Sequence, residues 1–261
     1  LSLAEVLPCY AVLQYLGQSF FGWQRQASQR TVQGELEQVL ERLVGRRVVT
    51  NAAGRTDTGV HAVGQVVSFG VPPRWKPAEL RRALNALLPR DVWVARLEEA
   101  PEGFHARRHA TSRWYRYVVG CDDATASPFR RPFEWALGLP LDGALMGAAA
   151  AACLGEHDFR AFAATGQRKP HYRCRVLAAR WDERPGGQGF IFTIEADRFL
   201  HHMVRFLVGT MVDVGRGRRP ANDVPRLLGS TSNADASPPA PPEGLYFMGA
   251  RYPQLEKDAD R

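Results

Sequence analysis

The sequence predicts an α+β protein built from two similar halves, residues 1–103 and 104–261, each with antiparallel strands and amphipathic helices. Two observations support this fold class. Strand-like runs follow one another closely enough in the chain to pair antiparallel, and segments with helix-spaced apolar residues lie between them. We expect the strands to form one continuous sheet, with helices on its outer face and the active site in a central cleft.

The first half should begin with a strand at Cys9–Gln14, followed by a loop that reaches Gln26. Thr31 is a suitable N-cap for a helix that Gly45 ends. The apolar face of this helix carries Val32, Leu36, Val39, Leu40 and Leu43. Further strands are expected at Val48–Ala53, Val63–Phe69 and Asp91–Glu98. A second helix should start at Pro77, with an inward face made of Leu80, Leu84, Leu87 and Leu88.

The second half repeats strands and helices in a similar order. Aromatic and β-branched residues predict a strand at Trp114–Val119, and Asp142 should cap an alanine-rich helix that reaches Leu154. The remaining expected elements are a hairpin of Tyr172–Glu183 and Phe190–Ala196, a helix at Arg198–Val214, a surface loop at Gly229–Glu243 and a closing strand at Leu245–Tyr252.

Length and composition are those of a globular protein. The chain has 261 residues, of which 45% are hydrophobic and 23% charged. No apolar run approaches the roughly 20 residues that a membrane helix needs. The first residues, Leu1–Pro8, lack the positive start of a secretory signal and lead directly into a predicted strand. We therefore expect a cytoplasmic protein without a membrane partner.

The four cysteines are far apart in the sequence and show no Cys-x-x-Cys spacing. Such an arrangement indicates neither a zinc site nor a redox pair. We expect all four cysteines to be buried and reduced.

The charge pattern favours a polyanionic partner. The formal net charge is +7, and arginine pairs recur along the chain with aromatic residues nearby. Net charge alone is weak support for such a partner. Arginine, however, greatly outnumbers lysine here, and a guanidinium group suits bidentate phosphate contacts and stacking on bases. A structured nucleic acid is therefore the preferred partner.

The most distinctive stretch is Gly54–His61, which reads Gly-Arg-Thr-Asp-Thr-Gly-Val-His. It sets one carboxylate, Asp57, between two glycines and close to Arg55. Glycines permit a tight turn and let a bulky ligand approach the main chain, so Asp57 is a candidate nucleophile that faces a cleft. Taken alone, the motif favours an ordinary turn in which an aspartate hydrogen-bonds its own backbone.

Two further segments combine cations with aromatic rings. Phe104–His109 contains Arg107 and Arg108 and, taken alone, is best interpreted as a charged surface. In Arg113–Tyr117, strand alternation directs Tyr115 and Tyr117 to one side. Such a pair can be part of a core, or one ring can stack on a nucleobase, a contact worth about 1–3 kcal/mol.

The segment Phe199–Arg205 contains two adjacent histidines, His201 and His202, which raise the question of a metal site. On the predicted helix, successive side chains diverge by about 100°. No partner set such as His-x-x-Glu-His accompanies them. We therefore expect no metal ligands here. Arg205 lies one turn from His201 and outside the apolar stripe.

Together these segments resemble the TruA-type tRNA pseudouridine synthases. The resemblance covers essentially the whole chain, in order and at matching spacing. It is carried by Phe21–Gln26, Gly54–Asp57, Tyr115–Tyr117, Leu154–Phe159, His202–Arg205, Gly209–Thr210, Val214–Gly217 and Gly244–Tyr246. The resemblance implies an isomerase that converts uridine to pseudouridine in the tRNA anticodon stem-loop (positions 38 to 40), without a cofactor and as a homodimer.

The resemblance also implies roles for single residues. Asp57 would be the carboxylate beside ribose C1′, acting as a nucleophile or as the base that starts a glycal route. Arg205 would pair with Asp57 and keep it ionised, since a nearby cation favours the charged form. Tyr115 would stack on the target uracil. Arg55 would help to hold the nucleotide out of its helix, because such enzymes must flip their target base.

Three more arginines, Arg107, Arg108 and Arg218, are candidate phosphate contacts. Two other functions remain open at this point. One is an RNA-binding protein, for example a chaperone, that has kept the fold and lost catalysis; intact Asp57, Tyr115 and Arg205 count against it. The other is a metal-dependent phosphodiesterase or nuclease that uses histidines and acidic residues, which loss of activity in EDTA would reveal.

Overall fold

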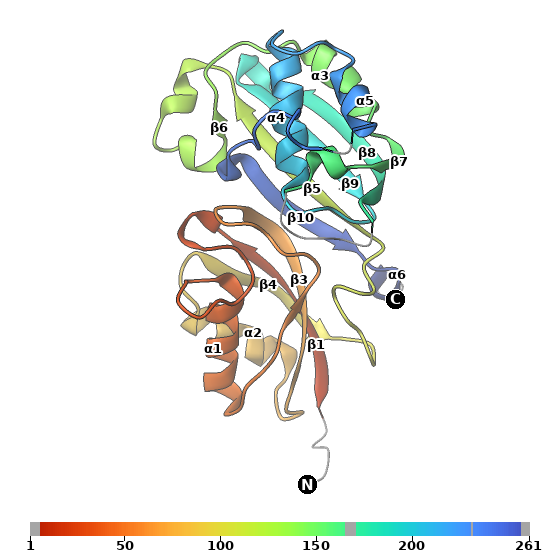
Figure 1. Ribbon diagram of the computed structural model, residues 1–261. Helices are drawn as coiled ribbons and strands as arrows, with labels where there is room; N and C mark the ends of the chain where they lie inside the picture. Colours follow the sequence, from red (N-terminus) through yellow and green to blue (C-terminus); the bar gives the residue numbers. More distant parts are fainter. Residues whose placement is uncertain (1–5, 165–170, 231, 257–261) are drawn as a thin grey trace. The chain divides into compact units, whose positions relative to one another are not determined.

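The structure, a computed structural model, describes residues 6–164, 171–230 and 232–256. The start of the chain, on which the expectation about a secretory signal partly rests, lies outside these ranges. The fold is mixed α/β, as predicted, and the chain forms two compact units (Figure 1). The first unit runs over residues 1–113 and 247–261, and the second over 114–246.

The first unit is built on an antiparallel sheet. Its strands lie in the order β4-β1-β3-β10, and the short β2 pairs with β3. Their bounds are β1 Leu7–Tyr15, β2 Asn51–Ala52, β3 His61–Val71, β4 Val92–Glu99 and β10 Leu245–Arg251. The register places Leu13 opposite Gln65 and Tyr15 opposite Ala62. The end of β1 therefore lies beside the start of β3, close to the segment that joins β2 to β3.

Two helices, α1 (Val32–Val44) and α2 (Pro77–Leu87), contact one another and accompany this sheet (Figure 1). The predicted cap is confirmed, since the Thr31 hydroxyl accepts from the Gly34 N–H, and Gly45 ends α1 in a left-handed conformation. The prediction for Leu87 is wrong, because this side chain at the end of α2 is 37% exposed while Leu84 is buried. A 3-10 turn at Gly17–Ser19 and helix α6 (Pro253–Glu256) complete the unit.

The second unit contains a sheet in the order β5-β9-β8-β7, with β6 parallel to β5. The strands are β5 Ser112–Gly120, β6 Trp135–Ala136, β7 Gly155–Asp158, β8 Arg173–Glu183 and β9 Gly189–Ala196. Strands β8 and β9 form the predicted antiparallel hairpin. Short 3-10 turns lie at Asp123–Ala126, Arg131–Phe133, Arg160–Phe162, Pro185–Gly187 and Pro242–Gly244.

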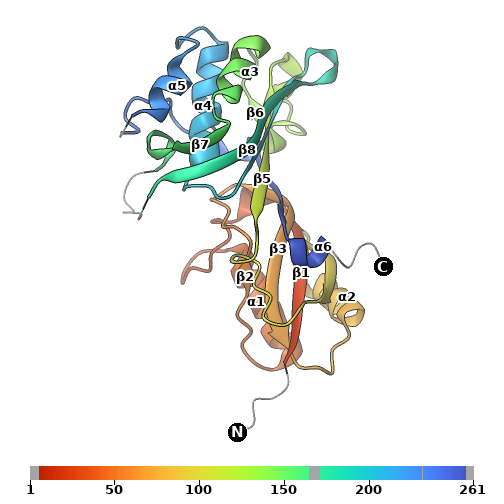
Figure 2. The same cartoon turned by 90° about the vertical axis from the view of Figure 1, so that its right-hand side faces the viewer.

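Three helices, α3 (Gly143–Ala151), α4 (Met203–Gly215) and α5 (Asp223–Leu228), lie on one face of this second sheet (Figure 2). Asp142 caps α3 as predicted. Helix α4 begins five residues later than expected, because His202 has a left-handed backbone (φ 61°) that interrupts any helix before Met203. Helix α5 has too few residues to show a clear apolar period and was not predicted.

The division between the units differs from the expected boundary after residue 103. Residues 104–113 and the end of β10 belong to the first unit. One reason is that β10 pairs with β3; another is that the Tyr252 hydroxyl donates to the carbonyl of Ala106 at 2.6 Å. Pairing of the late strand β10 with the early strand β3 cannot be read from neighbouring residues in the sequence.

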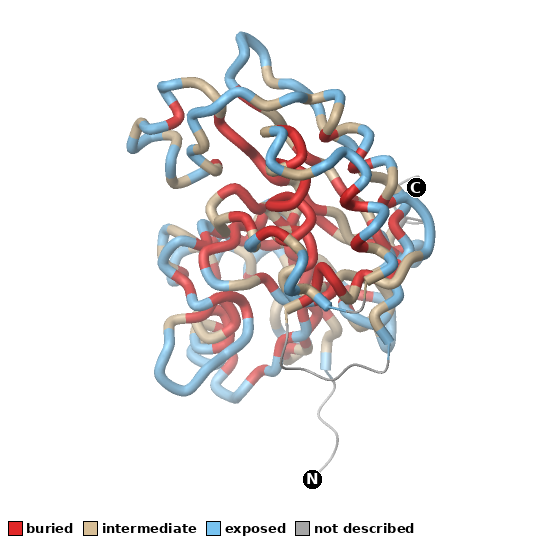
Figure 3. Tube along the Cα trace, turned by 45° about the horizontal axis from the view of Figure 1, so that its top comes forward, coloured by how far each residue is buried: buried red, intermediate tan, exposed pale blue. Residues whose placement is uncertain are grey.

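Buried residues are concentrated in the strands and on the inward faces of the helices (Figure 3). All four thiols are free and Cys9, Cys153 and Cys174 are buried, as expected; the prediction is wrong for Cys121, which is partly exposed. Burial raises the pKa of the Cys153 thiol to about 12, so this thiol is not reactive at neutral pH. Within the described ranges, no helix combines the length and the apolar character of a membrane span.

Candidate active site

The predicted turn around Asp57 joins β2 to β3 in the first unit. Thr56 is buried, Asp57 is partly exposed, and Arg55 is exposed. Gly59 has φ 81°, a conformation that glycine adopts without strain, and the Val60 N–H donates to the Asp57 carbonyl at 3.2 Å. Asp57 therefore lies in a turn whose backbone is closed by a local hydrogen bond.

The backbone on both sides of Asp57 is held by neighbouring segments. The Gln65 Nε2 donates to the Gly54 carbonyl at 2.7 Å, and the Trp23 N–H donates to the Thr56 carbonyl at 3.0 Å. After Asp57, the Gly59 N–H donates to the Phe20 carbonyl at 3.3 Å. These contacts restrict the peptide groups that carry the carboxylate.

Gly22 lets the loop after β1 approach this turn. A Cβ atom at Gly22 would lie 2.6 Å from the Thr56 carbonyl oxygen, well inside normal contact, and Gly22 has φ 81°. Any other residue here would push the loop away from the turn. The Phe21–Gln26 segment in the resemblance is therefore part of the scaffold of Asp57.

Sequence reasoning missed a buried polar cluster beneath the turn. The Tyr15 hydroxyl lies 2.8 Å from the Thr56 Oγ1, and the Gln65 Nε2 donates to the Tyr15 hydroxyl at 3.4 Å. Thr56 and Gln65 carried no separate signal, because one lies inside the motif and the other at a strand position that looked like ordinary alternation.

In the second unit, Tyr115 lies on β5 and is 8% exposed. Its ring packs edge-to-face with Phe199, with centroids 4.9 Å apart. Tyr117 is fully buried and donates from its hydroxyl to the Pro241 carbonyl at 2.7 Å, and burial raises its pKa well above the ordinary value. Tyr117 is therefore a core residue, whereas Tyr115 keeps a small exposed part.

Arg205 lies on the first turns of α4, and Ala240 holds it at two points. The Arg205 Nε donates to the Ala240 carbonyl at 2.6 Å, and the Ala240 N–H donates to the Arg205 carbonyl at 2.9 Å. Among the described residues of the second unit, Nη1 and Nη2 have no hydrogen-bond or ion-pair partner. The guanidinium is thus oriented through its Nε.

The segment that holds Arg205 is itself fixed on α4. The Ser237 hydroxyl donates to Asp213 at 2.7 Å, and a Cβ atom at Gly209 would lie 2.2 Å from the Pro238 carbonyl oxygen. The expectation that Gly229–Glu243 is simply a surface loop is wrong for this part, since Ser237 and Ala240 are each 2% exposed. Proline and serine suggested a surface loop, but here Pro238 lies against Gly209 of the helix and Ser237 is hydrogen-bonded to Asp213.

His201 and His202 do not lie on a helix, contrary to the prediction. Both residues precede α4, and their ring centroids lie 4.0 Å apart. The rings therefore do not diverge as successive helical side chains would.

The remaining predicted arginines lie on exposed segments. Arg107 and Arg108 are exposed in the turn before β5, where the Arg107 carbonyl accepts from Arg113 Nη2 at 2.5 Å. Arg218, whose side chain is 60% exposed, lies 3.9 Å from Asp213. An exposed pair at this distance contributes little to stability, so the Arg218 cation is available to another anion.

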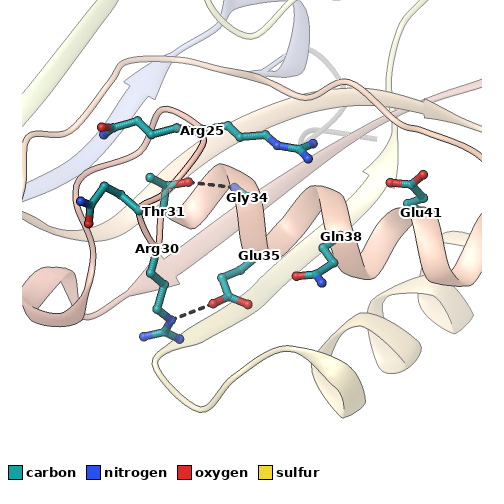
Figure 4. A pocket seen from close by; sticks show the side chains of 9 residues that line it. Arg25, Arg30, Thr31, Gly34, Glu35, Gln38 and Glu41 are labelled. Atoms are coloured by element: carbon teal, nitrogen blue, oxygen red, sulfur yellow. Dashed lines mark hydrogen bonds and ion pairs between the residues drawn. The ribbon is translucent and has the colours of Figure 1, made fainter.

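A separate hollow of about 370 Å³ lies along the start of α1 (Figure 4). Its lining contains none of the predicted site residues and carries both signs of charge. The lining residues are Arg25, Gln26, Gln29, Arg30, Thr31, Gly34, Glu35, Gln38 and Glu41.

Comparison with known proteins identifies the family. The sequence profile described as tRNA pseudouridine synthase matches residues 11–107 and 149–253. The chain belongs to this family. The matched segments contain Asp57 and Arg205, while Tyr115 lies in the stretch between them. Membership places the chain among the isomerases that form pseudouridine in tRNA.

Relatives named tRNA pseudouridine synthase A cover nearly the whole chain. The protein of Myxococcus xanthus is 44% identical over 92% of this chain and 90% of its own length. That of Moorella thermoacetica is 40% identical over 94% of this chain and all of its own length. Among solved structures, a chain of the archaeal box H/ACA sRNP Nop10-Cbf5 complex matches 78% of this chain and 44% of its own length, at 11% identity and a TM-score of 0.33, too low to support an argument.

Proposed function

We propose that this tRNA pseudouridine synthase isomerises uridines in the anticodon stem-loop, with Asp57 as its catalytic carboxylate. The observation that carries the proposal is the family's turn with a partly exposed aspartate, whose backbone is tied down on both sides. Reactions that depend on one group require that group to be positioned before the substrate arrives. A cytoplasmic homodimer is part of the same proposal.

The chemistry requires little beyond this carboxylate. The bond between ribose C1′ and uracil N1 breaks, the uracil turns over, and a bond between C1′ and C5 forms. The C5 proton leaves and N1 gains a proton, so no atom is lost and no oxidant or reductant is needed. Asp57 either attacks as a nucleophile or removes a ribose proton to start a glycal route.

Arg205 and Tyr115 complete the proposed site. With Nε bound to Ala240, the two terminal nitrogens of Arg205 can pair with a carboxylate in a bidentate manner. We assign them to Asp57, whose charged form they would favour. Tyr115 stacks on the uracil and, through its hydroxyl, is a candidate acceptor for the C5 proton.

Binding must also supply the free energy of base flipping. Extruding a nucleotide costs a few kcal/mol, and phosphate contacts by arginine can offset it. The exposed Arg55 lies two residues before Asp57 and is suited to hold the extruded nucleotide. Arg107, Arg108 and Arg218 are assigned to the more distant tRNA backbone.

A direct assay tests the function. The pure protein is incubated with an unmodified tRNA transcript, without added nucleotide and with EDTA, and modified positions are mapped by chemical labelling. We expect pseudouridine at uridines of the anticodon stem-loop. Conversion that requires a divalent metal, or RNA cleavage in place of conversion, would contradict the proposal and favour the phosphodiesterase alternative.

The salt dependence of tRNA binding tests the three distant arginines. Replacing Arg107, Arg108 and Arg218 by alanine, singly and together, is expected to weaken binding and to flatten the plot of log affinity against log salt, because each lost phosphate contact releases about one counterion fewer. Arg180→Ala, which removes an exposed arginine paired with Asp182 on β8, serves as the control. An unchanged slope would remove the three residues from the interface.

A further inference from the structure

A buried polar cluster lies directly beneath the proposed catalytic turn and takes no part in the chemistry described above. It consists of the side chains of Tyr15, Thr56 and Gln65, which are 4%, 6% and 0% exposed. Polar groups in an apolar core are unfavourable unless they are hydrogen-bonded. Their mutual hydrogen bonds therefore hold each group in a narrow range of positions.

Hydrogen bonds link the three side chains of this cluster to one another and to the turn. The Gln65 Nε2 donates both to the Gly54 carbonyl and to the Tyr15 hydroxyl, so the amide group is oriented. The Tyr15 hydroxyl also shares a hydrogen bond with the Thr56 Oγ1 at 2.8 Å, in which either oxygen can be the donor. Burial raises the pKa of Tyr15 to about 12, so its hydroxyl is protonated at neutral pH.

The cluster acts on the backbone just before Asp57. Thr56 is held through its hydroxyl by Tyr15 and through its carbonyl by the Trp23 N–H. That carbonyl belongs to the peptide group that joins Thr56 to Asp57. Gln65 holds the carbonyl of Gly54, two residues further back, while its own Oε1 has no partner among the described residues. The Gln65 amide therefore keeps its hydrogen bond to the turn although its own oxygen accepts none.

We propose that Tyr15, Thr56 and Gln65 are positioning residues for the Asp57 carboxylate. The inference rests on the proposed catalytic role of Asp57. None of the three needs to touch the substrate. A displacement of about 1 Å at a reacting group can cost roughly 100-fold in rate, whereas tRNA binding depends on exposed cations elsewhere. Loss of the cluster should therefore lower kcat and leave KM nearly unchanged.

The test removes single hydroxyl groups. Tyr15→Phe and Thr56→Val delete the same hydrogen bond from opposite sides, and each is expected to lower kcat by about 10-fold to 100-fold, with KM within about threefold. Thr56→Ser keeps the hydroxyl and should restore most of kcat. Both single changes break this shared contact, and Tyr15→Phe also removes the acceptor of one Gln65 hydrogen bond. The double variant should therefore be little worse than Tyr15→Phe alone.

Tyr10→Phe is the matched control. Tyr10 lies on the same strand, is 5% exposed, and donates its hydroxyl to Glu98, away from the turn. It should lose some thermal stability and keep kcat. If the Thr56→Val protein does not fold, the Tyr15→Phe protein alone tests the inference.

Two outcomes would overturn the inference. One is unchanged kcat in a folded Tyr15→Phe protein; the other is a loss of kcat in Tyr10→Phe as large as in Tyr15→Phe at equal Tm. Retained activity in Asp57→Asn would instead overturn the proposed role of Asp57, together with this inference. If Tyr15→Phe is as active as the wild type while Asp57→Asn is inactive, the positioning role is wrong and the role of Asp57 stands.

Discussion

Replacing Asp57 by asparagine is expected to abolish pseudouridine formation while changing tRNA affinity by less than tenfold, about 1.4 kcal/mol. Asparagine has the shape of aspartate, so the tied turn around it should persist. An amide, however, is neither a nucleophile toward C1′ nor a base for a ribose proton. Single-turnover conversion of a tRNA transcript and equilibrium binding of the same transcript measure the two effects separately.

Asp182→Asn provides the control for this change. Asp182 lies on β8 with an exposed side chain paired to Arg180, so the substitution alters net charge equally and leaves the turn untouched. Its conversion rate should equal that of the wild type. Turnover by Asp57→Asn at a rate near that of the control would remove Asp57 from the chemistry.

Arg205→Lys is expected to lower kcat by about 100-fold while the protein remains folded. Lysine keeps the charge and the apolar stem, but it has no Nε–H to donate to the Ala240 carbonyl and no planar fork. The cation would therefore lose its fixed orientation toward the carboxylate. Single-turnover rates at saturating enzyme, with melting temperatures as a check on folding, measure the effect.

Arg226→Lys is the matched exchange. Arg226 lies on α5, its Nε donates to the buried Asp223 at 2.7 Å, and its side chain is 53% exposed. This variant should lose a similar hydrogen bond, with at most a small change in stability and none in kcat. A normal kcat for Arg205→Lys would show that Arg205 supports the local structure of the Ala240 segment and not the reaction.

Local signals predicted most elements of the fold. The cap at Thr31, the proline at the start of α2 and the alternation along β5 each act over a few residues, and the structure confirms the elements that they predicted. The start of α4 was misjudged, because the apolar spacing continues through Leu200 while the backbone turns at His202. Hydrophobic periodicity reports burial, and a buried turn can mimic a helix.

The supports of the site were largely beyond sequence reasoning. The Asp57 motif could be recognised from its two glycines and from its position among the other segments of the resemblance. Its partners in the scaffold are far away in the chain: Tyr15 is 41 residues from Thr56, and Ala240 is 35 residues from Arg205. Hydrogen bonds between such distant positions leave no periodic pattern in a single sequence.

The sequence by itself determined the family, most of the strands and helices, and the carboxylate on which the proposed reaction depends, because short motifs and local periodicity specify these properties. Only the tertiary structure decided which groups hold that carboxylate and which group orients Arg205. The physical reason is that a buried hydrogen bond is specified by the meeting of two distant segments, and the pairing of segments is a property of the folded chain.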